Sequence, residues 1–323
     1  MKMFTQLIAA AAVATSLGSV AVAQTKDVTF TTDFGFNGRH CYFFTALDKG
    51  YYKAEGLNVT IISGKGSIDA VKKVATGTAQ IGFADPGAVI LGRANDNIPI
   101  KLLAIVYAKP PHAVFALVDS GMKVPKDLEG KTVADDPGGA QSLIFKAYAL
   151  KAGIDASKVK WISAAGPALP SLLATGRVDA IGQFMVGQPL LAAAVAPHKL
   201  VRFAYKDAGM DYYGNGIIAS EDTIKSDPAM LKAFIRATLK GMSYAFAHPA
   251  EAGEIMHKYH KEVSVEVGKG ETEIVKEIAD FPGHKMGVID EKSMQNTIEV
   301  MKNAFTFKRE VSAQEVYVPG FVE

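Results

Sequence analysis

The chain has 323 residues, of which 35 are Lys or Arg, 33 are Asp or Glu and one is cysteine. The two signs of charge are balanced and interspersed, so the composition gives no reason to expect a nucleic-acid partner or an anionic membrane surface. A single cysteine cannot form an internal disulfide. A hydrophobic core must therefore stabilise the fold, and a chain of this length is ample for one.

The N-terminal segment is typical of a secretory signal peptide. An Ala-rich apolar stretch covers residues 7–22 and ends in the small-x-small sequence Ala21-Val22-Ala23. No later segment approaches the roughly 20 apolar residues that a membrane-spanning helix requires. We expect residues 1–23 to be removed, which leaves a soluble periplasmic protein that begins near Gln24. Cys41 lies too far along the chain to be the lipid-bearing cysteine of a lipoprotein.

The next part of the chain alternates β-branched runs with helical patterns, and the alternation restarts near residue 114. The first set predicts strands at 28–32, 57–62 and 80–84 and helices at 41–54 and 67–76. The second set predicts strands at 114–118, 132–134, 159–163 and 178–181 and helices at 140–151 and 169–175. Such alternation indicates βαβ units with parallel strands, and two sets indicate two lobes.

Beyond Asp227 the sequence becomes helical, and Pro228 is suited to a first turn after an Asp cap. These helices have no strands of their own, so we expect them to pack on the sheet of the first lobe. The chain would then cross between the lobes twice, near 109–115 and 204–215.

The predicted fold class is therefore α/β, with two doubly wound lobes, a ligand cleft between them and extra C-terminal helices on the first lobe. The expected lobe boundaries are 24–112 and 213–323 for the first lobe and 113–212 for the second.

Several motifs resemble one known family. They are Ala46-Leu47-Asp48-Lys49-Gly50-Tyr51-Tyr52-Lys53-Ala54-Glu55-Gly56-Leu57-Asn58-Val59, Gly64-Lys65-Gly66-Ser67, Gly77-Thr78-Ala79-Gln80-Ile81-Gly82-Phe83-Ala84-Asp85, Leu128-Glu129-Gly130-Lys131-Thr132-Val133, Gly176-Arg177-Val178-Asp179-Ala180 and Phe234-Ile235-Arg236-Ala237-Thr238-Leu239-Lys240-Gly241. On these motifs the chain is similar to the periplasmic binding proteins of the type II fold. The branch it resembles holds the receptors for thiamine-pyrimidine precursors, riboflavin, and sulfonate or nitrate.

Within that branch, Asp33-Phe34-x-x-Asn37-x-x-His40 is similar to the Asp-Trp-x-x-Asn-x-x-His opening of the pyrimidine-precursor and riboflavin receptors. Phe34 stands where those receptors usually have Trp, so stacking is retained and an indole donor is lost. Gly187-Gln188 stands close to where the pyrimidine receptors have an acidic residue, and a neutral amide recognises a different set of donors and acceptors.

Ligands of doubly wound folds bind beyond the carboxyl ends of the strands, where loops and helix N-termini meet. The residues expected to contact the ligand are Phe34, Asn37, His40, Tyr42, Ser67, Asp85, Gly139, Gln141, Gln183, Gln188, Tyr213 and Asn215. Phe34 and Tyr213 are expected to stack on a flat ring, while the polar side chains supply directional hydrogen bonds. Closure of the lobes would bury the ligand.

Some of these residues have purely structural alternatives. Asn37 and Asp85 are suited to cap the helices that follow them, and His40 to a hydrogen-bonded position at a helix start. Tyr213 and Asn215 are equally suited to packing at the second crossover.

The resemblance implies a substrate-binding component that hands a pyrimidine- or flavin-like molecule to an ABC permease, and it implies a role in thiamine biosynthesis. A small organic anion is the alternative ligand, held by Ser67, Gly139 and Gln141 at helix N-termini, with Arg39 expected to point to solvent. Presentation of the ligand to a membrane sensor is the alternative role. We expect a monomer.

No catalytic role is expected. The sequence has no His-Glu-x-x-His, Cys-x-x-Cys or Gly-x-Ser-x-Gly motif. A relative of this fold that makes thiamine pyrimidine relies on a cysteine-rich motif, which Cys41 alone cannot supply. His257 and His260 are spaced i, i+3, but histidines late in a surface helix are usually solvated, so neither a metal nor a cofactor is expected.

Overall fold

The structure is a computed structural model that describes residues 25–136, 141–279, 283 and 285–322. Its first sheet has five strands in the order β2-β1-β3-β10-β4. The bounds are β1 (Lys26–Thr31), β2 (Leu57–Ile62), β3 (Ile81–Ala84), β4 (Ile100–Ile105) and β10 (Gly216–Ser220). β1 is parallel to β2 and β3, whereas β10 lies antiparallel between β3 and β4. A strand from late in the chain therefore completes a sheet that begins at the N-terminus.

The second sheet repeats this plan in the order β7-β6-β8-β5-β9. The bounds are β5 (His112–Leu117), β6 (Thr132–Asp135), β7 (Lys160–Ser163), β8 (Ala180–Phe184) and β9 (Leu200–Ala204). β6 is parallel to β7 and β8, and β5 lies antiparallel between β8 and β9. In each sheet the antiparallel strand, β10 or β5, lies between the three parallel strands and the edge strand, β4 or β9. The expected α/β fold with two lobes is confirmed.

Helices cover both sheets. The α-helices are α1 (Cys41–Asp48), α2 (Tyr51–Ala54), α3 (Ser67–Ala75), α4 (Pro86–Asp96), α5 (Gln141–Ala152), α6 (Leu169–Ala174), α7 (Gln188–Ala194), α8 (Glu221–Ser226), α9 (Pro228–Ala247), α10 (Pro249–Tyr259), α11 (Val265–Ala279), α12 (Glu291–Ala304) and α13 (Ala313–Val316). Short 3-10 segments join them, among which η1 (Gly38–His40), η6 (Met185–Gly187) and η7 (Tyr205–Ala208) lie near the site described below. Among the helices of the described ranges, none is long and apolar enough to cross a membrane.

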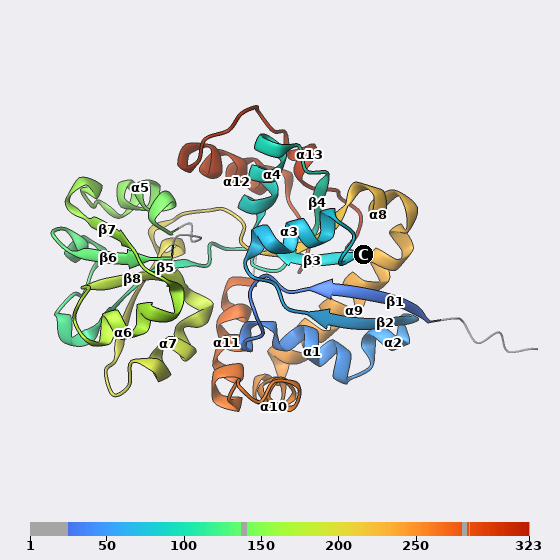
Figure 1. Cartoon of the computed structure of the whole chain (residues 1–323), viewed down its shortest axis with the longest axis horizontal. Coiled ribbons are helices and arrows are strands. Elements are labelled where there is room, and N and C mark those ends of the chain that lie inside the picture. The colour runs from blue at the N-terminus through green and yellow to red at the C-terminus, as the bar shows by residue number, and fades with distance from the viewer. Residues whose placement is uncertain (1–24, 137–140, 280–282, 284, 323) are drawn as a thin grey trace, which may run out of the picture.

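Figure 1 shows the two lobes side by side, with β5–β8 and α5–α7 on the left and β1–β4 with α1–α4 on the right. As expected, the late helices pack mainly on the first lobe: α9 lies on α1 and α2, and α12 and α13 lie on α4. Two of them also reach the second lobe, because α11 contacts α7 and η6 while α12 contacts α5. The lobes are therefore joined by helix contacts as well as by the crossovers.

The predicted helix over 41–54 is wrong in one respect, because the structure divides it into α1 and α2. Gly50 has φ 70°, a left-handed conformation that stops the first helix. The predicted strand at 178–181 also starts too early, since β8 covers Ala180–Phe184. The cap after the second crossover is as expected: the Asp227 side chain accepts from the Met230 N–H, and Pro228 opens α9.

Close packing of α9 on α1 gives the first testable prediction. A Cβ added at Gly241 would lie 2.5 Å from the Tyr42 carbonyl oxygen and 2.7 Å from Ala46 Cβ. In a solvated helix interior, Gly to Ala stabilises by up to about 1 kcal/mol. We expect Gly241→Ala to destabilise instead, by about 1–3 kcal/mol, because the backbone contact forces the helices apart.

Urea unfolding measures this change, and Gly92→Ala in α4 is the matched control. The nearest atom to a Cβ at Gly92 is the flexible Ile98 Cδ1 at 3.4 Å, an ordinary contact. The control should be neutral or stabilised. Equal effects at the two positions would show that packing of α9 on α1 does not determine the result.

Candidate functional site

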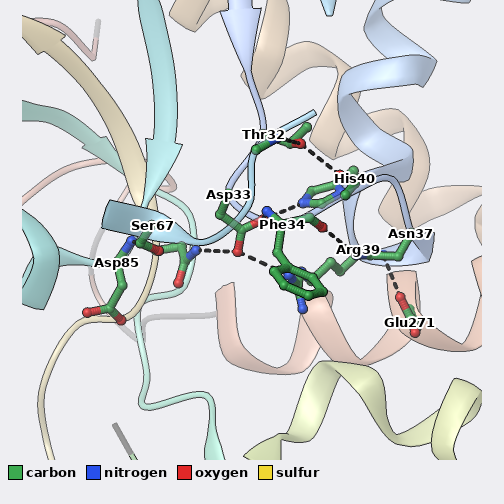
Figure 2. Close-up of polar contacts among 12 residues, drawn as sticks. Thr32, Asp33, Phe34, Asn37, Arg39, His40, Ser67, Asp85 and Glu271 are labelled. Carbon is green, nitrogen blue, oxygen red and sulfur yellow. Dashed lines mark hydrogen bonds and ion pairs between the residues drawn. The ribbon is translucent and has the colours of Figure 1, made fainter. Parts of the chain in front are cut away.

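A buried carboxylate, Asp33, lies just beyond the carboxyl end of β1. Its Oδ1 accepts from the Phe34 N–H at 2.8 Å and lies 2.7 Å from His40 Nε2. Its Oδ2 accepts from Asn215 Nδ2 at 2.9 Å and from Arg39 Nη2 at 3.1 Å. Figure 2 shows these contacts converging on Asp33, which therefore fixes the positions of four surrounding groups.

The charge of this carboxylate is retained despite its burial. Burial alone raises the pKa of Asp33, but the Arg39 guanidinium and the hydrogen bond from His40 outweigh it and lower the pKa to about 2. Burial lowers the pKa of His40, against the opposing effect of Asp33. A neutral His40 donates from Nε2 to the ionised carboxylate, so the arrangement needs only the Arg39 cation to balance Asp33.

Arg39 points inward, so the expectation that it faces solvent is wrong. Its side chain is 13% exposed and pairs with Asp33. Its backbone N–H donates to Glu271 Oε2 at 2.8 Å, which ties η1 to α11. Glu271 is 1% exposed, and burial raises its pKa to about 7 although Arg39 opposes the change. The physical reason for the inward orientation is that a buried carboxylate requires a cationic partner.

The loops after β2 and β3 adjoin Asp33. Gly64 packs closely on the loop after β1, because a side chain there would overlap the Thr32 carbonyl oxygen. The Gly66 N–H donates to the Asp33 carbonyl at 2.7 Å. Ser67, the first residue of α3, accepts from the Asp85 N–H at 3.0 Å. The Gly64-Lys65-Gly66-Ser67 motif thus joins three strand ends into one surface, as Figure 2 shows for Asp33, Ser67 and Asp85.

Asp85 caps α4, as its structural alternative predicts, and also retains an unsatisfied oxygen. Oδ1 accepts from the Gly87 N–H at 2.7 Å, whereas Oδ2 is buried and has no hydrogen-bond partner among the described residues. Burial raises the pKa of Asp85 to about 7. Capping therefore uses one of its two oxygens and leaves the other for a different partner.

Two side-chain amide oxygens of the first lobe, those of Asn37 and Asn215, are also buried without a hydrogen-bond partner among the described residues. Asn37 is not a side-chain cap; its Nδ2 donates to the Phe34 carbonyl at 2.9 Å. Asn215 donates its Nδ2 to Asp33. Because each amide nitrogen is engaged, the orientation of each carboxamide is fixed. Both Oδ1 atoms are buried and unpartnered within the described parts of the chain.

The second lobe contributes similar atoms at the end of β6 and the start of α5. Asp135 Oδ2 accepts from the Ser142 N–H at 3.0 Å, while its Oδ1 is buried and has no partner among residues that the structure describes. The same holds for Gln141 Oε1, on a side chain that is 5% exposed. The five oxygens of Asn37, Asp85, Asn215, Asp135 and Gln141 share burial and the lack of a described donor, and we call them the acceptor cluster for that reason. Gly139 lies outside the described residues.

Aromatic residues of the crossovers pack against one another between the two sheets. The Tyr212 hydroxyl lies 2.8 Å from His112 Nδ1, and the His112 ring stacks on Tyr205 at 5.9 Å between centroids. The pKa of Tyr212 is raised by burial and then by Asp85, and that of Tyr205 is raised by burial and, among nearby groups, by Asp135. The Tyr205 hydroxyl also donates to the Gln141 carbonyl at 2.9 Å, which ties this aromatic group to the start of α5.

The aromatic residues predicted to contact the ligand differ in exposure, because Phe34 is exposed whereas Tyr42 and Tyr213 are buried. Phe34 is 57% exposed on the loop after β1. Tyr42 is fully buried against Phe43, with ring centroids 4.3 Å apart. Tyr213 is 2% exposed, and its hydroxyl accepts from the Asp290 N–H at 2.9 Å, which favours the packing alternative for this residue. Asn215 is buried at the crossover, and its side chain points to Asp33.

Two glutamines lie on the second lobe. Gln183, on β8, is opposite Ala113 and close to Gly187, where an added Cβ would lie 2.6 Å from its Nε2. Gln188 accepts from Arg202 Nη1 at 3.0 Å, and Arg202 also lies 3.6 Å from Glu277 of α11. Gln188 is therefore engaged at the contact between α7 and α11.

Three residues of this site, Asp33, Glu271 and His112, are missing from the contact residues predicted from the sequence. Asp33 could have been found, because it opens the Asp33-Phe34-x-x-Asn37-x-x-His40 pattern at a strand end. Glu271 and His112 carry no local signal. A groove of about 310 Å³ between α3 and α4, closed by Phe305 and Thr306, contains none of the predicted contact residues.

Comparison with known proteins agrees with this architecture. The chain is 25% identical over 286 residues to the formylaminopyrimidine-binding protein of Halalkalibacterium halodurans, covering 87% of this chain and 86% of the relative. It is 23% identical to the riboflavin-binding protein RibY of Chloroflexus aurantiacus, covering 92% and 86%. It is also 25% identical to a 4-amino-5-hydroxymethyl-2-methylpyrimidine phosphate synthase of Aspergillus parasiticus, covering 71% and 70%.

Among solved structures, the periplasmic aliphatic sulphonate binding protein SsuA from Escherichia coli has the same fold. The TM-score is 0.70 at 12% identity, and the match covers 92% of this chain and 94% of SsuA. The family described as NMT1/THI5 like matches residues 37–252, which include Asn37, His40 and Asn215. The chain therefore belongs to the NMT1/THI5-like family.

Proposed function

We propose that the chain is the periplasmic substrate-binding component of an ABC importer and that it captures a small, flat heteroaromatic molecule of the pyrimidine or flavin kind. Two relatives named for binding a formylaminopyrimidine and riboflavin support this role. The two-lobed fold supports it as well, because a ligand held between lobes shifts the equilibrium toward a closed form. The permease would then recognise that form.

The acceptor cluster carries the choice of ligand class. Its five side-chain oxygens are buried and lack partners in the described segments, and a buried acceptor without a donor is unfavourable by about 1–3 kcal/mol. A ligand that presents several N–H groups would satisfy them. Amino-substituted heteroaromatic rings present such donors at their edge, and their flat faces suit the exposed ring of Phe34.

The same geometry argues against a small organic anion. Such a ligand would lie near the ionised carboxylate of Asp33, and the Arg39 cation is already paired with that carboxylate. The buried polar atoms of the described chain that lack a partner also include Arg39 Nε, beside Asp33. This donor would suit a ring nitrogen or a carbonyl of a neutral ligand.

We infer binding rather than catalysis, although one relative is named as a synthase. The thiol of Cys41 is fully buried, and burial raises its pKa to about 12, so it is not a nucleophile at neutral pH. Within the described residues, no group of three or more His, Cys, Asp or Glu side chains could hold a metal ion. Mass spectrometry of the ligand recovered after incubation tests this inference, and any new product contradicts it.

We also propose where the chain is cleaved, where its two lobes begin and end, and how it acts. Cleavage after Ala23 would release a mature chain into the periplasm, with 24–112 and 213–323 forming the first lobe and 113–212 the second. We propose that the protein acts as a monomer and delivers its ligand to a permease; transfer of the ligand to a membrane sensor would use the same binding step.

A ligand panel tests the proposed function. Purified mature protein is heated with aminopyrimidines, riboflavin or alkyl sulfonates, and its melting temperature is recorded. We expect a selective increase with a pyrimidine or flavin, because a ligand at a hundred times its Kd stabilises the folded state by about 2.7 kcal/mol. A selective increase with sulfonates alone would contradict the role of the acceptor cluster and support the anion alternative.

A further inference from the structure

We propose that Asp33 is a positioning residue that sets the hydrogen-bonding specificity of the site through Asn215. This inference rests on the proposed function and identifies what selects the ligand's donors. Asp33 Oδ2 accepts from Asn215 Nδ2 at 2.9 Å, and Asn215 Oδ1 is buried without a partner in the described chain. The Asp33 contact therefore decides that Asn215 offers an acceptor, not a donor, to a bound molecule.

The backbone of Asn215 leaves its side chain little other freedom. The Asn215 carbonyl accepts from the N–H groups of Val106 and Tyr107, both at 2.9 Å. A Cβ at the preceding Gly214 would lie 2.8 Å from both Pro111 Cδ and Tyr107 Cβ. Because the side chain is also 0% exposed, a half-turn of the carboxamide is the change that needs the least space, and it would exchange oxygen for nitrogen at the unpartnered position.

Asp33 selects one of these two orientations because an ionised carboxylate only accepts hydrogen bonds. All four groups around it donate: the Phe34 N–H, His40 Nε2, Arg39 Nη2 and Asn215 Nδ2. Turning the Asn215 carboxamide would place its oxygen against a carboxylate oxygen. Two facing acceptors repel, so the observed orientation is the stable one.

An asparagine at position 33 would reverse the choice. Its single oxygen would take the place of Oδ1, where the Phe34 N–H is fixed backbone and His40 also donates. Its NH₂ group would then occupy the place of Oδ2 and face both Asn215 Nδ2 and Arg39 Nη2. Arg39 has only donors, so its side chain would lose this contact and move, whereas the Asn215 carboxamide can turn. The Asn215 carboxamide would turn to accept from it and present N–H groups to the ligand.

The experiment compares two probes that differ in one group, 4-amino-5-hydroxymethyl-2-methylpyrimidine and its 4-oxo analogue. Calorimetry gives the Kd of each for the native protein and for Asp33→Asn. We expect the native protein to bind the amino compound more tightly and Asp33→Asn to shift the ratio of the two constants by about tenfold or more toward the oxo compound. A ratio unchanged by the substitution would overturn the inference.

Two further variants separate specificity from folding. Glu273→Gln changes a carboxylate of α11 whose side chain is 53% exposed, so the ratio should stay at the native value. Asn215→Ala removes the carboxamide and should bring the ratio closer to one even if Asp33→Asn does not fold. A native ratio in Asn215→Ala would overturn the inference. Native protein that binds neither probe would instead contradict the proposed ligand class, and the inference with it.

Discussion

Replacing Phe34 by alanine should weaken ligand binding by roughly ten- to a hundredfold, because stacking of an aromatic side chain on a heterocyclic base contributes about 1–3 kcal/mol. The ring is 57% exposed on the loop after β1, next to the residues that hold Asp33. Its backbone is fixed by the bridge to Lys65 and by the hydrogen bond to Asp33. A side chain so exposed on a fixed loop is available for a ligand.

Titration calorimetry measures the change with whichever compound the ligand panel identifies. The melting temperature of the free protein should hardly move, since an exposed ring contributes little to stability. Phe34→Trp, which restores the residue usual in the related receptors, should bind at least as well as the native protein. Leu150→Ala, at another exposed apolar side chain that is 84% accessible, should leave the Kd unchanged. Unchanged affinity in Phe34→Ala would remove Phe34 from the site.

The second large effect concerns the pH dependence of stability. Glu271 is 1% exposed, and burial raises its pKa to about 7 in the folded protein, whereas an unfolded glutamate has a pKa of about 4.3. A carboxyl whose pKa is raised on folding stabilises the folded state fully below its unfolded pKa. That contribution is lost as the pH rises through the folded pKa. Its full size is about 4 kcal/mol, because a tenfold change in proton affinity corresponds to about 1.36 kcal/mol.

Glu271→Gln should therefore flatten the stability profile. The amide oxygen can still accept from the Arg39 N–H but does not titrate. Between pH 5 and pH 8 we expect the free energy of unfolding of the native protein to fall by about 1–3 kcal/mol more than that of the variant. Asp85, whose pKa burial also raises to about 7, contributes to both proteins and cancels in the comparison.

Urea unfolding at the two pH values provides the measurement. Glu273→Gln on the same helix is the matched control, because its side chain is 53% exposed. The control should follow the native profile. If Glu271→Gln also follows it, Glu271 is ionised in the folded protein at pH 5, and burial does not raise its pKa.

The sequence by itself determined the order of many strands and helices and the residues that cap several of the helices. Strand and helix patterns at 57–62, 67–76 and 132–134 correspond closely to β2, α3 and β6, because periodicity and turn residues act locally. The cap at Asp227 and the placement of Asp85 at a helix start follow for the same reason. Local chemistry also drew attention to Asn37 and His40, beside Asp33.

Only the tertiary structure decided how these groups are paired. Asp33 meets Asn215 across 182 positions because β10 inserts between β3 and β4, and Arg39 meets Glu271 across 232 positions because α11 packs on η1. A periodic pattern shows which face of an element is buried but not which distant polar group lies opposite. The inward turn of Arg39 and the raised pKa of Glu271 both follow from burial, since desolvation makes a charge dependent on partners that another part of the chain supplies.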